Sequence, residues 1–192
     1  MTATHFLHLA RRLAVTAPLV VGAACASAGE SNAGPAVGEA APSFSVQAVT
    51  REGPVAAPVT LQEQRGKTVV LAFFPKARTP GCTTQMEAYR DQFATIFNGG
   101  KDVLLLAVST DSDDTLVRWA RESNFPFTFV SDADGVLAGK YGALGLGGMF
   151  DKRVLYVIDP GGKVSYKAAP FRQSSADAYT QLDAEIDRVA TP

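Results

Sequence analysis

The stretch FFPKARTPGCTTQ, residues 73–85, contains Cys82, the side chain best suited to covalent chemistry in this sequence. The chain has two cysteines, and the other, Cys25, lies in an apolar N-terminal stretch. A cysteine can act as a small buried hydrophobe, one half of a disulfide, a metal ligand or a nucleophile. The residues around Cys82 and the composition of the rest of the chain discriminate among these four roles.

Cys82 stands at the start of a predicted helix that is expected to end at the sequence NGG. Apolar residues follow it at helical spacing and would form one face: Cys82, Met86, Tyr89, Phe93, Ile96 and Phe97. Unpaired backbone N–H groups and the positive end of the helix dipole favour a thiolate in the first turn, by about 1–2 kcal/mol. A stable thiolate requires a cation as well, and the candidates are Arg78, Arg153 and Arg90.

The loop before Cys82 has the features of a preset pocket for a small, oxygen-rich ligand. Gly81 allows the backbone to approach a ligand closely, and N–H groups at a helix start donate to oxygen. The Thr79 hydroxyl can both donate and accept, while Pro75 and Pro80 restrict the backbone. Gly81 and Cys82 are therefore the candidate substrate-binding residues.

Residues 1–28 differ in composition from the rest of the chain. Arg11 and Arg12 precede an uncharged stretch, LAVTAPLVVGAACASA, and the first acidic residue is Glu30. This order is that of a secretory signal peptide, which has a short basic region, then an apolar stretch, then a cleavage site of small residues. We predict cleavage after Ala28. We therefore expect an exported protein, periplasmic or secreted.

Alternatives to a cleaved secretory signal stay open. The apolar run is shorter than the roughly 20 residues of a membrane span and contains Pro18, which disfavours an anchor. An acid-free segment with arginines also fits an organelle transit peptide. ARRLAV matches only part of a twin-arginine signal, and lipidation of Cys25 is disfavoured because Gly22 stands where a large apolar residue is usual.

Cleavage after Ala28 would remove both histidines, His5 and His8, together with Cys25. The mature chain would lack the histidine of Ser–His–Asp and Cys–His catalysis, a Cys/His zinc site and an intramolecular disulfide. Two arginines and no acidic residue would be lost, so the net charge of −1 becomes −3. We expect no metal, no cofactor, no nucleic-acid partner and no stable membrane association.

Strand and helix patterns alternate along the rest of the chain, after a small-residue stretch at 29–42 that predicts a flexible lead-in. Strands are expected at 43–49, 59–61, 68–74, 102–109 and 127–130, with a hairpin around DPGG at 159–162. Helices are expected at 82–97, 112–124, 133–141 and 174–189. This order predicts one α/β domain, residues 43–190, with a mixed sheet and helices on its faces. The loop leaving a central strand, where chemistry concentrates in such folds, is the loop with Cys82.

The segment PKARTPGC, residues 75–82, has the Pro-x-x-x-Thr-x-x-Cys pattern of peroxiredoxins. Several further segments resemble the bacterioferritin-comigratory, or Q-type, branch of that family. They are TPGCTTQ, YRDQF and the later blocks VSTDS, FPFTFVSDADGVLAGKYGA and RVLYVIDPGGKV. The resemblance covers about residues 38–190. It implies a thioredoxin-like fold, with a central mixed β-sheet and helices on both faces.

The resemblance also implies an activity and a set of roles. Cys82 would be the peroxidatic nucleophile, Thr79 a peroxide-positioning hydroxyl, Pro75 a shield and Arg153 the cation that stabilises the thiolate. The implied reaction is thiol-dependent reduction of hydrogen peroxide and/or organic hydroperoxides through a Cys82 sulfenic acid. A thiolate beside hydrogen-bond donors, without a histidine base, suits attack on a weak O–O bond.

Two positions depart from the pattern of that branch. Gln85 stands where relatives often have glutamate, and Glu87 stands where many carry a resolving cysteine, five residues after Cys82. The sequence therefore resembles a one-cysteine enzyme that an external thiol reduces, either a thioredoxin-like protein or a small thiol. We expect a monomer or a weak homodimer.

Two other functions remain as alternatives. An exported thiol–disulfide oxidoreductase, or a copper-handling thioredoxin relative, is disfavoured because both normally use paired cysteines. A non-catalytic binding or holdase module with the same fold is disfavoured because Pro75, Thr79, Cys82 and Arg153 are all present.

Overall fold

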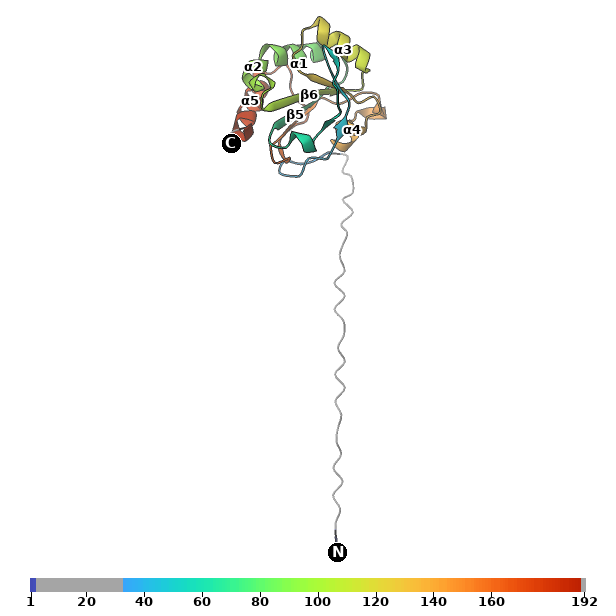
Figure 1. The fold of residues 1–192 in the computed structure, drawn as a ribbon, viewed down its shortest axis with the longest axis vertical. Coiled ribbons are helices and arrows are strands. Elements are labelled where there is room, and N and C mark those ends of the chain that lie inside the picture. Colours follow the sequence, from blue (N-terminus) through green and yellow to red (C-terminus); the bar gives the residue numbers. More distant parts are fainter. Residues whose placement is uncertain (3–32, 191–192) are drawn as a thin grey trace.

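The computed structural model describes residues 1–2 and 33–190, and its centre is a mixed β-sheet (Figure 1). The strands lie in the order β3 (Gly53–Pro54), β2 (Ala48–Thr50), β7 (Thr128–Ser131), β6 (Val103–Ser109), β5 (Thr68–Phe73), β8 (Val154–Ile158) and β9 (Val164–Ala168). β5, β6 and β7 are parallel, and the flanking strands pair antiparallel. β1 (Ser45–Val46) and β4 (Val59–Thr60) form a separate small sheet.

The central strands are continuous apolar runs because both of their faces are covered. Every residue of β5 is buried, and six of the seven residues of β6 are buried. Such runs are typical of parallel strands inside an α/β sheet. The predicted strands at 68–74 and 102–109 are therefore confirmed, and β8 and β9 form the predicted hairpin.

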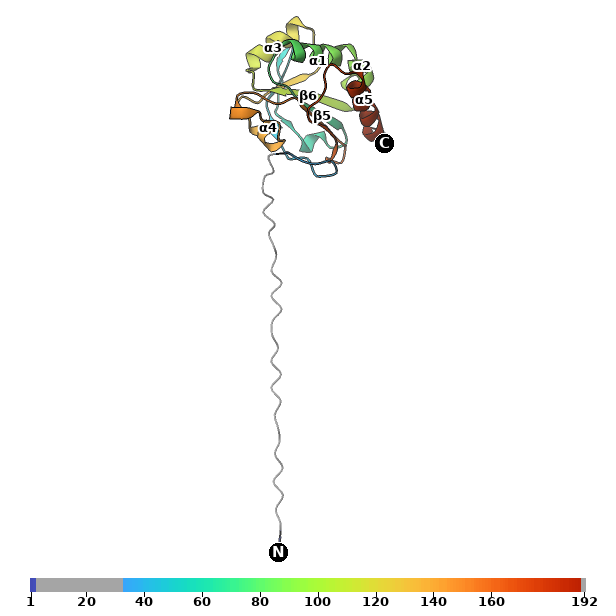
Figure 2. The same ribbon diagram turned by 180° about the vertical axis from the view of Figure 1, so that it is seen from behind.

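Helices cover both faces of the sheet, but unequally. One face carries α1 (Pro80–Asp91), α2 (Phe93–Ile96), α3 (Asp113–Glu122) and α5 (Ala176–Ala190). The other face carries α4 (Val136–Lys140), together with loop residues such as Tyr141 and Phe44. Figure 2 shows the same division from behind. Short 3-10 turns connect these elements at Gln62–Gln64, Asn98–Gly100 and Leu146–Gly148. The predicted α/β class is confirmed.

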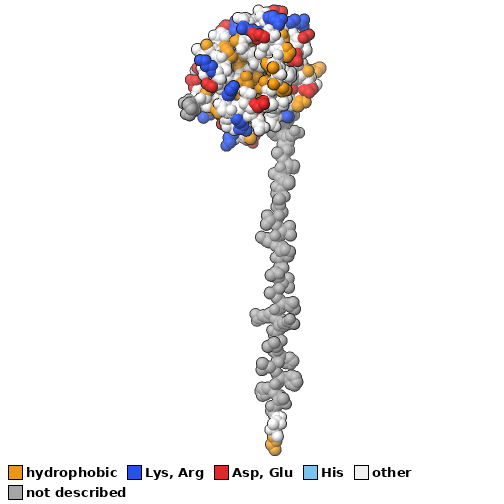
Figure 3. Space-filling model, in the orientation of Figure 1, with side chains coloured by type: hydrophobic (Ala, Val, Ile, Leu, Met, Phe, Trp, Pro, Cys, Tyr) orange, Lys and Arg blue, Asp and Glu red, His pale blue; other side chains and the backbone are white. Residues whose placement is uncertain are grey.

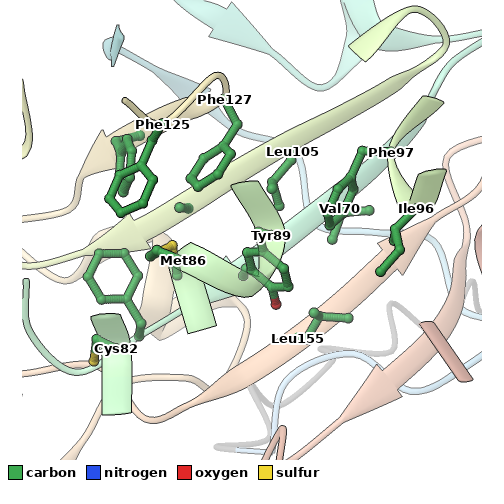
Figure 4. Close-up of a cluster of buried hydrophobic side chains, with 14 of the residues drawn as sticks. Val70, Cys82, Met86, Tyr89, Ile96, Phe97, Leu105, Phe125, Phe127 and Leu155 are labelled. Atoms are coloured by element: carbon green, nitrogen blue, oxygen red, sulfur yellow. The ribbon is translucent and has the colours of Figure 1, made fainter. Parts of the chain in front are cut away.

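The helix predicted for residues 82–97 is divided into α1 and α2. Gln92 has φ −109° and ψ 15°, which interrupts the helix after Asp91. The apolar stripe nevertheless continues into the core: Cys82, Met86, Tyr89, Ile96 and Phe97 are buried (Figure 4). Side-chain periodicity therefore predicted the buried face correctly but did not reveal the break in the backbone.

Residues 33–42, predicted as flexible, are held against the β8–β9 hairpin. The Gly38 N–H donates to the Val164 carbonyl at 2.8 Å, and the Ala41 N–H donates to the Gly162 carbonyl at 3.0 Å. The Lys167 ammonium donates to the Ala33 carbonyl at 2.6 Å. This segment is ordered by long-range backbone hydrogen bonds, which its small-residue composition does not encode.

The predicted signal peptide lies outside the described residues, apart from residues 1–2. Within the described part of the chain, no helix is long and apolar enough to cross a membrane. On the face shown in Figure 3, basic and acidic side chains are interspersed.

Candidate active site

The start of α1 is placed at the carboxyl end of β5 by a short loop. Thr79 is extended, with φ −76° and ψ 150°, and occupies the N-cap position before Pro80. Proline suits the first helical position because its fixed φ matches the helix and no N–H is needed there. The Thr83 N–H donates to the Thr79 carbonyl at 2.8 Å, so Cys82 lies in the first turn.

Asp111, from the loop after β6, anchors the loop that leads to Cys82. Its Oδ2 accepts the Ala77 N–H at 2.7 Å and the Ser109 hydroxyl at 3.0 Å. Because β5 and β6 are parallel, their carboxyl ends lie at the same edge of the sheet. The sequence reasoning did not identify Asp111, although polar residues directly after two neighbouring parallel strands were a signal for such a contact.

Arg153 is the cation that reaches the cysteine. Its Nη2 lies 3.2 Å from Cys82 Sγ, and Cys82 is fully buried. Arg153 directly precedes β8, whose Val154 pairs with Phe73 at the end of β5. The antiparallel pairing thus brings the start of β8 to the place where the loop to Cys82 begins. A guanidinium at this distance is positioned to donate a hydrogen bond to the sulfur.

Gln85 and Tyr89 extend this contact along α1. The Arg153 Nη1 donates to Gln85 Oε1, and Gln85 Nε2 donates to the Tyr89 hydroxyl oxygen at 2.8 Å. Both side chains are fully buried. Burial raises the pKa of Tyr89 well above its ordinary value, so the phenol stays neutral. The sequence identified Gln85 only as a departure from the family pattern and Tyr89 only as an apolar-face residue.

The other two candidate cations interact with other groups. Arg78 forms an exposed ion pair with Glu122 at 2.7 Å, and its backbone has φ 64°. Arg90 pairs with Asp91 at 2.8 Å and donates to the Ser123 carbonyl. Of the three arginines, the structure brings Arg153 to the sulfur.

The remaining predicted site residues lie in the same loop or the first turn. The Thr79 hydroxyl donates to the Lys76 carbonyl at 2.9 Å, which leaves its oxygen able to accept. Pro75 is half-buried in the loop. A Cβ at Gly81 would lie 3.1 Å from Gln173 Nε2, a tight approach, and 3.4 Å from Arg153 Nη2, an ordinary contact, so Gly81 lies directly against both side chains.

The described residues contain no group of three or more His, Cys, Asp or Glu side chains that could hold a metal ion. Cys82 is the free cysteine of this part of the chain, and Glu87 is exposed on α1. The arrangement at Cys82 is therefore a buried sulfur in the first turn of a helix, 3.2 Å from a guanidinium nitrogen, with Thr79 at the N-cap of the same helix.

Comparison with known proteins agrees with this geometry. Residues 37–167 match the model of the AhpC/TSA family. This chain belongs to the AhpC/TSA family. Peroxiredoxin Bcp of Escherichia coli (strain K12) is 33% identical over 144 residues, which are 72% of this chain and 88% of that protein. The chloroplastic peroxiredoxin Q of Sedum lineare is 35% identical over 108 residues, 56% of this chain and 57% of that protein.

Solved peroxiredoxin structures have the same fold. Peroxidoxin BcpB from Mycobacterium tuberculosis superposes with a TM-score of 0.67 at 26% identity, covering 81% of this chain and 98% of that one. Peroxiredoxin Q from Xanthomonas campestris gives a TM-score of 0.65 at 23% identity, covering 77% and 92%. The predicted family, its bacterioferritin-comigratory or Q-type branch and the thioredoxin-like fold are confirmed. The chain is a peroxiredoxin-type thiol peroxidase.

Proposed function

We propose that this peroxiredoxin reduces hydrogen peroxide and/or organic hydroperoxides at Cys82 and is regenerated by an external thiol. The observation that carries the proposal is the 3.2 Å contact between Arg153 Nη2 and Cys82 Sγ in the first turn of α1. The guanidinium and the helix N-terminus both stabilise negative charge on the sulfur. The thiolate is the nucleophile in cysteine chemistry, so these two groups supply the reactive species.

The reaction proceeds in two steps. The Cys82 thiolate attacks the terminal oxygen of the peroxide, and an S–O bond forms as the O–O bond breaks. The other oxygen leaves with the electron pair and takes a proton, giving water or an alcohol, and Cys82 becomes a sulfenic acid. Arg153, which directly precedes β8, and the hydroxyl of Thr79, at the N-cap of α1, are the groups of this chain assigned to hold the two oxygens.

The second step requires a thiol from outside the chain. Its sulfur attacks the Cys82 sulfenic acid, releases water and leaves a mixed disulfide, which a second thiol reduces. Glu87 occupies the position of a resolving cysteine, and after loss of Cys25 no second cysteine remains. The reductant is a thioredoxin-like protein or a small thiol, and the peroxidase acts as a monomer or weak homodimer.

Peroxide consumption with dithiothreitol tests this function directly. We expect the Cys82→Ser variant to lose about 1000-fold or more in rate, because the nucleophile is removed. Cys25→Ser is the matched control and is expected to keep the wild-type rate. A dimedone adduct on Cys82 after peroxide treatment would identify the sulfenic acid. Equal, slow consumption by wild type and Cys82→Ser would contradict the proposal.

A disulfide-exchange assay without peroxide separates the oxidoreductase alternative. A single-cysteine peroxidase is expected to reduce or isomerise a model disulfide no faster than dithiothreitol alone, because that chemistry normally uses a second cysteine. Catalysis of disulfide exchange that depends on Cys82 would favour the alternative. A protein inactive in both assays would fit the binding module instead.

We also propose that residues 1–28 direct export and are removed after Ala28. Mass spectrometry of the protein recovered from the cell envelope and the medium is expected to show Gly29 as the first residue. A retained N-terminus, or a diacylglyceryl group on Cys25, would overturn this assignment.

A further inference from the structure

A chain of four side chains runs from the active-site sulfur into the core. Cys82 Sγ lies 3.2 Å from Arg153 Nη2, Arg153 Nη1 donates to Gln85 Oε1, and Gln85 Nε2 donates to the Tyr89 hydroxyl oxygen at 2.8 Å. We propose that Tyr89 is a positioning residue, which holds the Gln85 amide in the orientation that keeps Arg153 against Cys82. This inference rests on the proposed function of Cys82.

The amide of Gln85 has to be oriented because its two ends are chemically different. The guanidinium of Arg153 has only donors, so it must meet the amide oxygen. The NH₂ end then points the other way and needs an acceptor. Gln85 is fully buried, and the Tyr89 oxygen is the acceptor that the structure provides. Without it, a flipped amide would turn its donors toward Arg153.

The spacing on α1 places the three helix residues along one face. Gln85 is three residues after Cys82, and Tyr89 is four residues after Gln85, so each pair lies about one turn apart. In Figure 4 the side chains of Cys82, Met86 and Tyr89 project from successive parts of this helix. The chain of contacts therefore follows the helix from its first turn toward its end.

Aromatic packing fixes the position of the Tyr89 ring. The ring lies edge-on to Phe97 with centroids 5.3 Å apart, and edge-on to Phe127 and Tyr179 at 6.3 and 6.0 Å. Phe171 packs against it at 6.2 Å. A hydroxyl on an immobile ring is a fixed acceptor, so the position of Arg153 depends on the packing of the core.

The two side chains that hold Arg153, Gln85 and Tyr89, are both neutral, so they leave the positive charge of Arg153 available to Cys82. Gln85 carries no charge, and burial keeps the Tyr89 phenol protonated. A glutamate at position 85 would place a carboxylate on the guanidinium and compete with the Cys82 thiolate for it. The Gln85–Tyr89 pair holds Arg153 without neutralising it.

The test is a comparison of Tyr89→Phe in two backgrounds, in the full chain. With Gln85 present, Tyr89→Phe is expected to lower kcat/KM for peroxide about three- to tenfold, the loss of one neutral hydrogen bond. With Gln85→Glu present, Tyr89→Phe is expected to cause no further loss, because a carboxylate has two equivalent acceptor oxygens. Tyr141→Phe, which removes the hydroxyl of a buried tyrosine on the other face of the sheet, is the control.

A second readout does not depend on peroxidase activity. The rate of Cys82 alkylation by iodoacetamide at pH 6, relative to pH 9, reports how well the thiolate is stabilised. We expect this ratio to fall in Tyr89→Phe and to stay unchanged in Tyr141→Phe. If the wild type does not reduce peroxide but the ratio still falls in Tyr89→Phe, the positioning role stands and the proposed function is wrong.

The proposal is overturned if Tyr89→Phe and Tyr141→Phe change kcat/KM and the alkylation ratio equally. It is also overturned if Tyr89→Phe lowers kcat/KM by the same factor in the Gln85→Glu background as in the wild-type background. If Tyr89→Phe does not fold, the double variant decides. A folded Gln85→Glu/Tyr89→Phe protein with the activity of Gln85→Glu supports the orienting role, because the unsatisfied amide is then the cause of misfolding. An unfolded double variant overturns it.

Discussion

At the scale of single residues, the reactivity that we propose for Cys82 depends on which cation reaches its sulfur. The sequence alone does not distinguish Arg78, Arg90 and Arg153 as candidate cations. In the structure Arg78 pairs with Glu122, and Arg90 pairs with Asp91. Arg153 alone among the three contacts the sulfur, and its second nitrogen is held by Gln85. A planar guanidinium makes both contacts at once, which an ammonium group does not.

Replacing Arg153 is expected to slow the reaction with peroxide. We expect Arg153→Gln to lower kcat/KM about 100-fold, by analogy with the loss of one preorganised donor at a developing charge. Arg153→Lys should recover part of that loss. Arg78→Gln, which removes an exposed ion pair nearby, is the control and should stay within about twofold. Stopped-flow kinetics of Cys82 oxidation would measure all three, and equal effects of the Arg153 and Arg78 variants would contradict the assignment.

A methyl group at position 81 is expected to press on the Gln173 side chain rather than on Arg153. The Cβ of Gly81→Ala would lie 3.1 Å from Gln173 Nε2, which must shift slightly, and 3.4 Å from Arg153 Nη2, an ordinary van der Waals contact. We expect activity to stay within about threefold of the wild type, because Arg153 keeps its place at Cys82. Gly139→Ala, in α4, has no atom within 4 Å of the new Cβ, and it should raise the melting temperature without changing activity. Activity assays and thermal unfolding of both variants compare the two sites.

At the scale of elements, the site is assembled where three segments meet. The loop after β5 carries Cys82, the loop after β6 carries Asp111, and the residue before β8 is Arg153. The first two share one edge because β5 and β6 are parallel, and β8 begins there because it is antiparallel to β5. Strand direction therefore decides which residues of distant segments become neighbours.

Loss of the Asp111 carboxylate is expected to loosen the loop before α1. Its Oδ2 accepts hydrogen bonds from Ala77 and Ser109, and bonds to a charged group contribute about 1.5–3 kcal/mol each. We expect Asp111→Ala to lower the free energy of unfolding by about 3 kcal/mol and to reduce peroxidase activity. Asp114→Ala, an exposed residue in the first turn of α3, should cost less than about 1 kcal/mol. Urea denaturation monitored by tryptophan fluorescence provides the comparison.

At the scale of the whole molecule, a buried carboxyl links stability to pH. Asp151 is fully buried, and neither of its side-chain oxygens has a hydrogen-bond partner among the described residues. Burial, with Asp132 and Asp111 nearby, raises the pKa of Asp151 to about 8. The folded protein thus keeps a proton that the unfolded chain releases near its ordinary pKa of about 4.

The sign of the resulting pH dependence follows from this difference. The folded state binds the extra proton between about pH 4 and pH 8, so the free energy of unfolding falls as pH rises through that range and levels off above it. Asp151→Asn is expected to reduce this fall. Between pH 5 and pH 9 the variant should therefore lose less free energy of unfolding than the wild type does. Part of the fall remains because burial also raises the pKa of Asp132.

Urea denaturation at pH 5, 7 and 9 measures this effect, with Asp177→Asn as the control. Asp177 is exposed in the first turn of α5, and its substitution should leave the pH dependence unchanged. The assignment of Asp151 fails if Asp151→Asn and wild type lose stability in parallel between pH 5 and pH 9.

Much of this protein was determined by the sequence itself. The buried strands, the hairpin, the apolar face after Cys82 and the placement of Cys82 at a helix start follow from periodicity and turn chemistry, which are local properties. The motif from Pro75 to Cys82 indicated the family for the same reason, because its residues are close together in the chain.

The tertiary structure decided what local patterns do not contain. The contact of Arg153 with Cys82, the anchoring role of Asp111 and the order of residues 33–42 all join segments far apart in the sequence. The Gln85–Tyr89 contact is local in sequence, but it has a role only because β8 brings Arg153 to the same place. The pairing of β5 with β6 and β8 brings these distant segments together. Local sequence patterns predict the strands but do not specify which strands pair.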